Sequence, residues 1–236
     1  MKRILYMILK CFFIVPVWFF KIWWYGKTDK YTEEQRYNLL QKITSKVNKA
    51  GRVTIEPHGI CNLPKEEGYI MFPNHQGMFD VLALLETHKR SFTVVIKKEA
   101  ENVMLLKQVI RLLKAQVIDR DDIRQSMKII MQMTKEVKEG RNYVIFPEGT
   151  RSKEKNNLLE FKGGSFKSAM NAKCPIVPVA LIDSYKAFDT NSIEAVKVEV
   201  HYLPPLYYDE YKDMKSVDIA KEVKCRIETV IKMQEK

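Results

Sequence analysis

The sequence has few of the features that build metal centres, disulfide frameworks or nucleophilic serines. Its four cysteines share no paired spacing, so we expect neither a metal motif nor a disulfide set. Residues 163–166, Gly-Gly-Ser-Phe, do not match the G-x-S-x-G turn that presents a serine nucleophile. The absence of internal repeats and low-complexity tracts excludes solenoid and fibrous architectures. The scattered cysteines are Cys11, Cys61, Cys174 and Cys225.

Positive charge is what the chain has in excess. Lys and Arg number 40 against 29 Asp and Glu, which gives a net charge of +11 over 236 residues. This length suits one substantial domain. A basic surface attracts nucleic acid, anionic membranes and acidic proteins alike, so charge alone does not identify the partner.

The N-terminal residues favour a membrane partner over nucleic acid. Residues 4–20 are almost unbroken apolar sequence, interrupted by Lys10 and Pro16. A spanning helix needs about 20 apolar residues, so spanning is not favoured. Residues 21–25, Lys-Ile-Trp-Trp-Tyr, are typical of the headgroup layer, and no small-residue cleavage site follows that would indicate a signal peptide.

A second helix is predicted over residues 31–49, where Leu40, Ile43 and Val47 share one face. Two helices joined near Gly26 would form a hairpin that enters one leaflet and returns. We therefore expect a helical membrane anchor over residues 1–50, with a boundary near Gly51 and a second domain over residues 51–236.

From residue 52 onward, short β-like runs alternate with helical ones, which predicts an α/β fold. One helix is expected to have Ile123, Met127, Ile130 and Met133 or Thr134 on one face. The predicted strands are 53–60, 69–72, 92–96, 116–118, 143–146, 176–181 and 196–203. The predicted helices are 81–86, 100–114, 122–138, 165–172 and 217–232.

Residues 74–80, Asn-His-Gln-Gly-Met-Phe-Asp, place a histidine and a carboxylate five positions apart. Five residues advance about 500° around a regular helix, so the two do not share a helical face. We therefore place His75 in the turn after the strand 69–72 and Asp80 in the first turn of the next helix. There the carboxylate reaches one imidazole nitrogen, as in a general base with its orienting acid. A helix-capping histidine would give the same spacing.

Residues 146–152, Phe-Pro-Glu-Gly-Thr-Arg-Ser, follow an apolar run and carry the groups of an anion site. Gly149 allows close approach, Thr150 can donate a hydrogen bond, and Arg151 can hold a phosphate through two parallel N–H bonds. Glu148 would repel a phosphate, so we expect it to orient Arg151 or the loop, or to bind a substrate hydroxyl. A polar turn with a surface salt bridge is the alternative.

The two strings together resemble the motifs of glycerolipid acyltransferases, in particular the 1-acylglycerol-3-phosphate acyltransferases. Many members have serine where this chain has Gly77. The resemblance implies a mixed central sheet flanked by helices, with an acyltransferase domain over residues 51–236. It also implies that Arg120, which ends a Val-Ile-Asp-Arg block, and Lys98 contact the acceptor's phosphate. Residues 175–179, Pro-Ile-Val-Pro-Val, match a further block, which we expect to be structural, although an edge strand or bulge would look the same.

The activity implied is transfer of a fatty acyl group from a thioester to the sn-2 hydroxyl of 1-acylglycerol 3-phosphate (lysophosphatidic acid), giving phosphatidic acid. Either acyl-coenzyme A or acyl carrier protein would serve as donor, with no cofactor and no metal. We expect a membrane phospholipid surface and no nucleic acid as partner, with the catalytic domain on the cytoplasmic side of the cell membrane. Glycerol 3-phosphate or another lysophospholipid as acceptor, thioester hydrolysis, and non-catalytic binding of anionic lipid remain alternatives.

The three remaining histidines have no acidic partner at a suggestive spacing. We therefore expect them to be surface residues or satisfied core residues. They are His58, His88 and His201.

Overall fold

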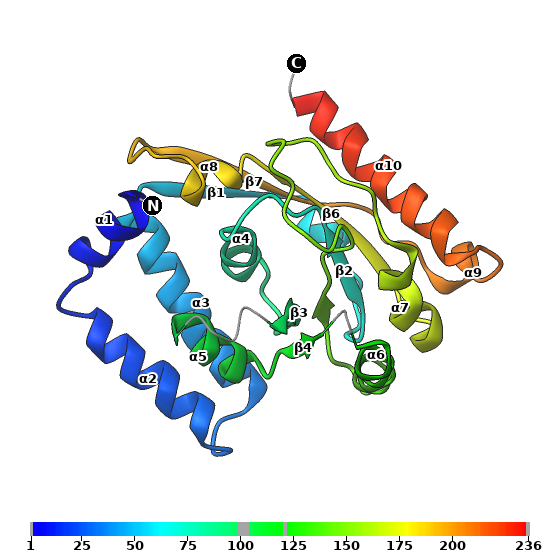
Figure 1. The fold of residues 1–236 in the computed structure, drawn as a ribbon, viewed down its shortest axis with the longest axis horizontal. Helices are drawn as coiled ribbons and strands as arrows, with labels where there is room; N and C mark the ends of the chain where they lie inside the picture. The colour runs from blue at the N-terminus through cyan, green and yellow to red at the C-terminus, as the bar shows by residue number, and fades with distance from the viewer. Residues whose placement is uncertain (1, 99–103, 120–121, 235–236) are drawn as a thin grey trace.

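The computed structural model describes residues 2–98, 104–119 and 122–234, and its centre is a seven-stranded sheet (Figure 1). The predicted mixed α/β class is confirmed, and each strand overlaps a predicted one. The strands are β1 (Val53–His58), β2 (Ile70–Pro73), β3 (Thr93–Lys97), β4 (Gln116–Ile118), β5 (Tyr143–Val144), β6 (Ile176–Ile182) and β7 (Val196–Tyr202).

The strands lie in the order β1-β7-β6-β2-β5-β3-β4, and all pairs are parallel except β6 with β7. The carboxyl ends of β6, β2, β5, β3 and β4 therefore meet at one edge of the sheet, where parallel sheets bind ligands. The strand β6 lies inside the sheet, between β7 and β2. The edge-strand alternative for residues 175–179 is therefore wrong, and Pro178 occupies an interior strand.

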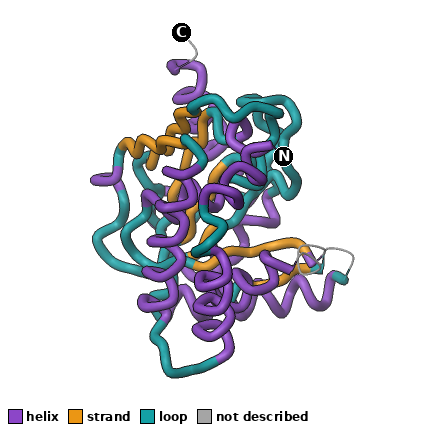
Figure 2. The backbone as a smooth tube through the Cα atoms, turned by 90° about the vertical axis from the view of Figure 1, so that its left-hand side faces the viewer, coloured by secondary structure: helices purple, strands orange, loops and turns teal. Residues whose placement is uncertain are grey.

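Helices cover both faces of the sheet, and the alternation of side chains along β2 shows why. Tyr69 and Met71 belong to a core packed against α3 (Glu33–Ala50), α4 (Asp80–Thr87) and α5 (Met104–Leu113). Ile70 and Phe72 point the other way, to a core shared with α6 (Ile123–Lys138), α7 (Lys167–Ala172) and α10 (Ser216–Gln234). Figure 2 shows the helices on the side of α1 and α2 lying in front of the strands.

The short helices connect these layers. They are η1 (Ile60–Asn62), η3 (Gly163–Phe166), α8 (Tyr185–Phe188) and α9 (Tyr208–Tyr211).

The buried face of α6 differs from the predicted one. Ile123 and Met127 are exposed, at 74% and 59%, whereas Ile129, Met133 and Val137 are buried. Apolar residues four positions apart run along this helix in two stripes, and only the stripe that faces the sheet enters the core.

The N-terminal apolar segment is broken into two helices where one was expected. Helix α1 (Lys2–Lys10) and helix α2 (Val15–Lys27) meet at 95°, and Pro16 lies in the first turn of α2, where its missing N–H costs nothing. No single helix among the described residues has the length and apolar composition to cross a bilayer, whereas this bent pair passes that test as a unit.

The segment 28–32 links α2 to α3. The helices were predicted to join near Gly26, which lies inside α2. Thr32 and Gln35 form a capping box that starts α3, because each side chain binds the other residue's backbone N–H. The side chains of Tyr37 and Leu40 are buried in the core on one face of the sheet. The domain boundary near residue 50 stays a prediction.

The N-terminal helix α1 is held against the rest of the chain by Arg3, whose side chain is fully buried. Its guanidinium donates to the carbonyl oxygens of Ala187 at 2.9 Å, Gly51 at 2.6 Å and Glu194 at 2.8 Å. Burial lowers the pKa of Arg3. Since a buried cation needs its donors satisfied, these carbonyls fix where α1 docks.

His88 is a buried, satisfied histidine, as predicted. Its Nδ1–H donates to the carbonyl of Arg90 at 2.7 Å, and its Nε2 accepts from the Tyr69 hydroxyl at 2.7 Å. Burial lowers the pKa of His88 to about 4 from its usual 6.5. The folded state therefore keeps the ring neutral where the unfolded chain would protonate it.

A His88→Gln variant should reveal this pKa shift as a pH dependence of stability. Above pH 6.5 the ring is neutral in both states, and as the pH falls toward 4 only the unfolded chain takes up the proton. The wild type should therefore lose about 3 kcal/mol of unfolding free energy over this range that the variant does not lose. Urea unfolding at several pH values tests this, and a gap that stays constant with pH would contradict it.

Candidate active site

The imidazole of His75 lies in the turn after β2 and is held by the first residue of α4, as the sequence predicts. Its Nδ1 lies 2.7 Å from Oδ2 of Asp80, and since a carboxylate only accepts, the neutral ring carries its proton on Nδ1 and keeps a free lone pair on Nε2. The His75 ring stacks on Phe146 with centroids 4.2 Å apart. About a fifth of the His75 side chain is exposed, so a substrate can reach it.

The carboxylate of Asp80 is fully buried and satisfied by four donors. Its Oδ2 accepts from the backbone N–H groups of Gln76 at 2.7 Å and Gly77 at 3.0 Å as well as from His75. Its Oδ1 accepts from the hydroxyl of Ser184 at 2.5 Å. The start of α4 also favours a negative charge. This environment fixes both the carboxylate and the imidazole tautomer.

The residues on either side of His75 attach the turn to the end of β6. The Asn74 side chain accepts from the backbone N–H of Leu181 at 2.7 Å and donates to its carbonyl at 3.0 Å. The amide of Gln76 donates to the same carbonyl at 2.9 Å. The segment 74–76 therefore cannot rotate away from the sheet edge.

The second motif, residues 146–152, forms hydrogen bonds with the backbone of His75. Oε1 of Glu148 accepts from the His75 backbone N–H at 2.6 Å, and Oε2 accepts from Leu159 N–H at 2.9 Å. The backbone N–H of Ser152 donates to the carbonyl of His75 at 2.7 Å. Burial raises the pKa of Glu148, and the N–H donors of His75 and Leu159 counteract part of that rise. Glu148 thus holds loops in place, which is one of the roles left open by the sequence.

The guanidinium of Arg151 lies near Asp189, and the Asp189 carboxylate lies against Gly77 of the first motif, residues 74–80. Arg151 Nη1 is 3.8 Å from Oδ1 of Asp189, and a Cβ added to Gly77 would collide with the other oxygen of that carboxylate. A serine at position 77 would therefore require the Asp189 carboxylate to move. Thr150 is exposed, and Gly149 has φ 76°, a conformation that favours glycine.

Of the remaining predicted residues, Lys98 directly follows β3 and lies at the same edge of the sheet. Lys98 is exposed and its Nζ lies 2.9 Å from Oδ2 of Asp119. Arg120 lies outside the described residues. The parallel pairing of β3 with β4 brings Lys98 next to Asp119, the residue that follows β4.

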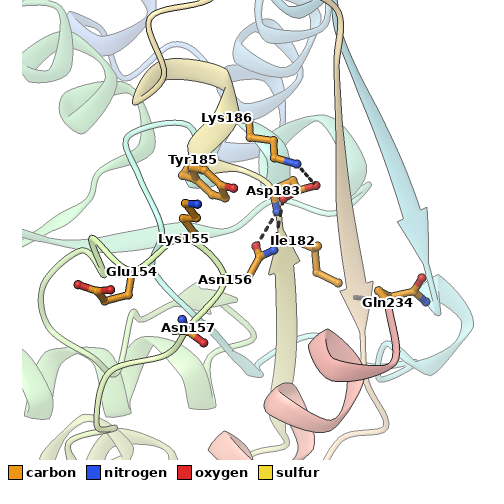
Figure 3. A pocket seen from close by; sticks show the side chains of 9 residues that line it. All are labelled: Glu154, Lys155, Asn156, Asn157, Ile182, Asp183, Tyr185, Lys186 and Gln234. Carbon is orange, nitrogen blue, oxygen red and sulfur yellow. Dashed lines mark hydrogen bonds and ion pairs between the residues drawn. The ribbon is translucent and has the colours of Figure 1, made fainter. Parts of the chain in front are cut away.

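A cavity of about 370 Å³ lies next to this site (Figure 3). Asn156 connects the two, because its side-chain oxygen accepts from Gln76 at 2.7 Å and from the backbone N–H of Asp183 at 3.0 Å. The predicted site residues do not line this cavity. Its lining consists of Glu154, Lys155, Asn156, Asn157, Ile182, Asp183, Tyr185, Lys186 and Gln234.

Some polar partners were missed because they are distant in sequence. Ser184 lies 104 residues from Asp80, and no spacing pattern reveals such a pair. The exposed His58 and the buried, hydrogen-bonded His201 agree with the expected surface and satisfied core residues. Both nevertheless have an acidic partner, because Glu199 lies 3.8 Å and 2.9 Å from their rings. The Glu-x-His spacing on one strand was a usable signal, since residues two apart share a face.

A Glu148→Gln variant should unfold more easily by about 1–3 kcal/mol. Glutamine has one oxygen, so either the His75 or the Leu159 N–H would face an amide NH₂ without an acceptor. Urea unfolding measures the change, and Glu154→Gln on the exposed part of the loop serves as the matched control. Equal stability of the two variants would show that the Glu148 contacts contribute nothing.

A family model described as Acyltransferase matches residues 54–182, which is more than half of the chain. A 1-acyl-sn-glycerol-3-phosphate acyltransferase of Cocos nucifera is 30% identical over 145 residues, 60% of this chain and 47% of that protein. One from Helicobacter pylori is 29% identical over 150 residues, covering 59% and 63%. The matched regions therefore cover less than two thirds of the length of each of these two relatives.

A probable 1-acyl-sn-glycerol-3-phosphate acyltransferase of Mycoplasma pneumoniae is 26% identical over 212 residues, 83% of this chain and 77% of that protein. The crystal structure of the 1-acyl-sn-glycerophosphate acyltransferase of Thermotoga maritima has the same fold, with a TM-score of 0.78 at 20% identity, covering 100% of this chain and 98% of that one. Matched in sequence over more than half its length, the chain belongs to the acyltransferase family.

Proposed function

We propose that the protein transfers a fatty acyl group from a thioester to the sn-2 hydroxyl of 1-acylglycerol 3-phosphate, giving phosphatidic acid. The observation that carries this proposal is the His75 imidazole, with Nδ1 bound to a fully buried carboxylate and a free lone pair on Nε2. The acceptor is supported by the activity named for the curated relatives.

In this mechanism Nε2 of His75 takes the proton of the acceptor hydroxyl while that oxygen attacks the thioester carbonyl. The tetrahedral intermediate then collapses, the carbon–sulfur bond breaks, and the imidazolium returns its proton to the departing thiolate. Asp80 holds the ring in place through Nδ1 and stabilises the imidazolium. The acceptor itself is the nucleophile, so the mechanism needs no acyl-enzyme.

The acceptor's phosphate would bind at the sheet edge through Arg151, with Lys98 and Arg120 as further cations. In the free protein Arg151 is within 3.8 Å of Asp189 and about half exposed. A phosphate offers a guanidinium two parallel hydrogen bonds, so it would replace Asp189 as the partner. Thr150 and the backbone at Gly149 would supply additional donors.

We also propose that α1 and α2 insert into one leaflet of the cell membrane, with the catalytic domain on the cytoplasmic side. The apolar side chains at the bend between these helices point outward, and Phe13 is 94% exposed. Burying such rings in lipid is favourable. The exposed apolar side chains of this segment are Leu5, Ile8, Leu9, Phe12, Phe13, Ile14, Val17, Phe20 and Trp24.

Acyl transfer to 1-acylglycerol 3-phosphate by the membrane-reconstituted protein tests the reaction. Acyl-coenzyme A and acyl carrier protein are both offered as donors, and glycerol 3-phosphate and other lysophospholipids as competing acceptors. His75→Ala should lower the rate by roughly 100-fold or more, because it removes the general base. Asp209→Asn, at a side chain 89% exposed, should keep the wild-type rate.

Two outcomes would reject the proposed reaction. Equal rates for His75→Ala and the wild type would remove the proposed base and favour a lipid-binding role. Free fatty acid produced without an acceptor would identify a thioester hydrolase.

Replacing Phe12 and Phe13 together by serine should weaken binding to phosphatidylglycerol vesicles by roughly tenfold or more, because two large apolar side chains no longer enter the bilayer. Cosedimentation measures the binding. Met233→Ser, at another apolar residue that is 67% exposed but lies on α10, is the control and should bind as the wild type does. Equal loss in both variants would contradict insertion through the bend.

A further inference from the structure

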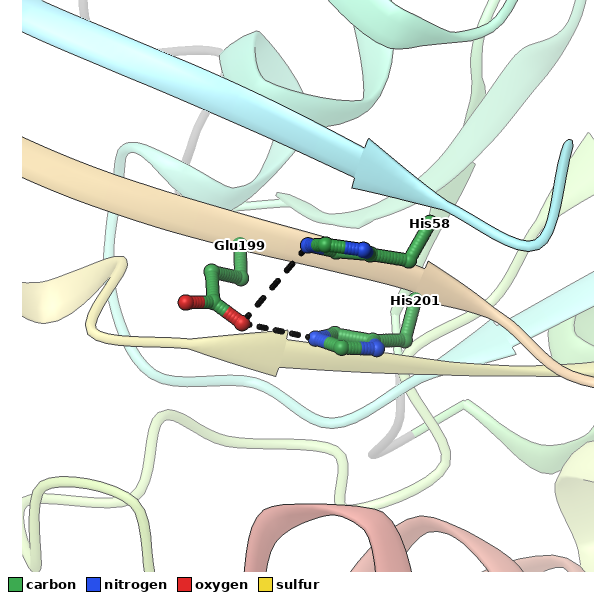
Figure 4. A group of neighbouring side chains, drawn as sticks. All are labelled: His58, Glu199 and His201. Carbon is green, nitrogen blue, oxygen red and sulfur yellow. Dashed lines mark hydrogen bonds and ion pairs between the residues drawn. The ribbon is translucent and has the colours of Figure 1, made fainter. Parts of the chain in front are cut away.

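Two histidines and a glutamate meet on one face of the sheet, away from the residues assigned to acyl transfer (Figure 4). His58 ends β1 and is paired in register with His201 of β7. Glu199 lies two residues before His201, so its side chain is on the same face. The two imidazole rings stack, with centroids 4.3 Å apart and planes 17° from parallel.

Both rings direct Nε2 toward the same carboxylate oxygen. Oε2 of Glu199 lies 2.9 Å from Nε2 of His201 and 3.8 Å from Nε2 of His58. The three groups can each offer a ligand atom within 4.8 Å of the other two. Tetrahedral zinc, with bonds of about 2.0–2.1 Å, requires its ligand atoms about 3.3 Å apart. Because the two rings are stacked and nearly parallel, binding one ion requires them to rotate about their side-chain torsions until both Nε2 atoms point at it.

The neighbouring charges leave one carboxylate oxygen for a cation. Lys197 Nζ lies 3.1 Å from Oε1 of Glu199 and 2.8 Å from Oε2 of Glu56. Oε1 of Glu199 is therefore occupied by the ammonium, while Oε2 faces the rings. The charge of Lys197 opposes a bound cation, so its removal should favour binding.

We propose that His58, Glu199 and His201 bind one Zn²⁺ ion or a similar divalent transition metal ion, with solvent as the fourth ligand. Two imidazoles and one carboxylate are a ligand set that zinc uses, whereas Mg²⁺ and Ca²⁺ prefer oxygen ligands. His201 is buried and the side chain of His58 is 45% exposed, which leaves the open position toward water.

A bound ion would act as a cross-link at the edge of the sheet. Within the described residues, β1 is the terminal strand and pairs with β7 alone. The ion would join the end of β1 to β7 and oppose fraying of that strand. This consequence is independent of acyl transfer, and so is its test.

Zinc binding by the full-length protein in detergent, after removal of metals with a chelator, tests the proposal. Competition with a chromophoric chelator should give one Zn²⁺ per chain, and the midpoint of thermal unfolding should rise with zinc and remain unchanged with Mg²⁺. His58→Ala and Glu199→Gln should each weaken zinc binding by roughly tenfold or more. Lys197→Met should tighten it.

His75→Ala is the matched control, because it removes another accessible histidine and should leave zinc binding unchanged. Circular dichroism verifies that each variant is folded. Equal zinc affinity in the wild type, His58→Ala and Glu199→Gln would overturn the proposal. Weaker zinc binding by Lys197→Met would also overturn the proposal. So would a wild-type protein that binds less than one Zn²⁺ per chain.

Discussion

The burial of the Asp80 carboxylate is the constraint on which the arrangement of the site depends. A charge in a fully buried position is tolerated only when donors surround it, and Asp80 has one imidazole, one hydroxyl and two backbone N–H groups. To supply them, the turn 75–77 must wrap around the start of α4, and the segment after β6 must bring Ser184 close. Satisfying one carboxylate thus positions the base.

A second buried carboxylate, Glu148, extends the same logic to the neighbouring strand. It accepts the backbone N–H of His75 and that of Leu159, so the loop after β5 and the turn after β2 hold each other. The parallel pairing of β2 with β5 brings their carboxyl ends together. The two motifs, residues 74–80 and 146–152, are therefore parts of one hydrogen-bonded unit, in which the Arg151 guanidinium lies near the first motif beside Asp189.

The N-terminal helices and the site share a structural element. Arg3 of α1 donates to the carbonyl of Ala187 in α8, and Asp189 follows two residues later, beside Arg151. Phe188 of α8 packs edge-on against Phe79, which precedes Asp80. The helix pair proposed to enter the lipid is thereby anchored to the segment that borders the acceptor's proposed phosphate site, an arrangement suited to a substrate arriving from the membrane plane.

The sequence by itself determined the strands, most helices and the contact of His75 with Asp80, because these follow from local periodicity and from spacing within one turn. The tertiary structure decided which stripe of α6 is buried and where the N-terminal helix bends. It also decided that Ser184 contacts Asp80, Asp189 lies beside Arg151, and Glu199 reaches His58. Those outcomes depend on how strands pair and helices dock between separate segments of the chain, as with Ser184 and Asp80, which are 104 residues apart. No local pattern records a contact of that kind, since it arises only when the sheet brings distant segments to a common edge.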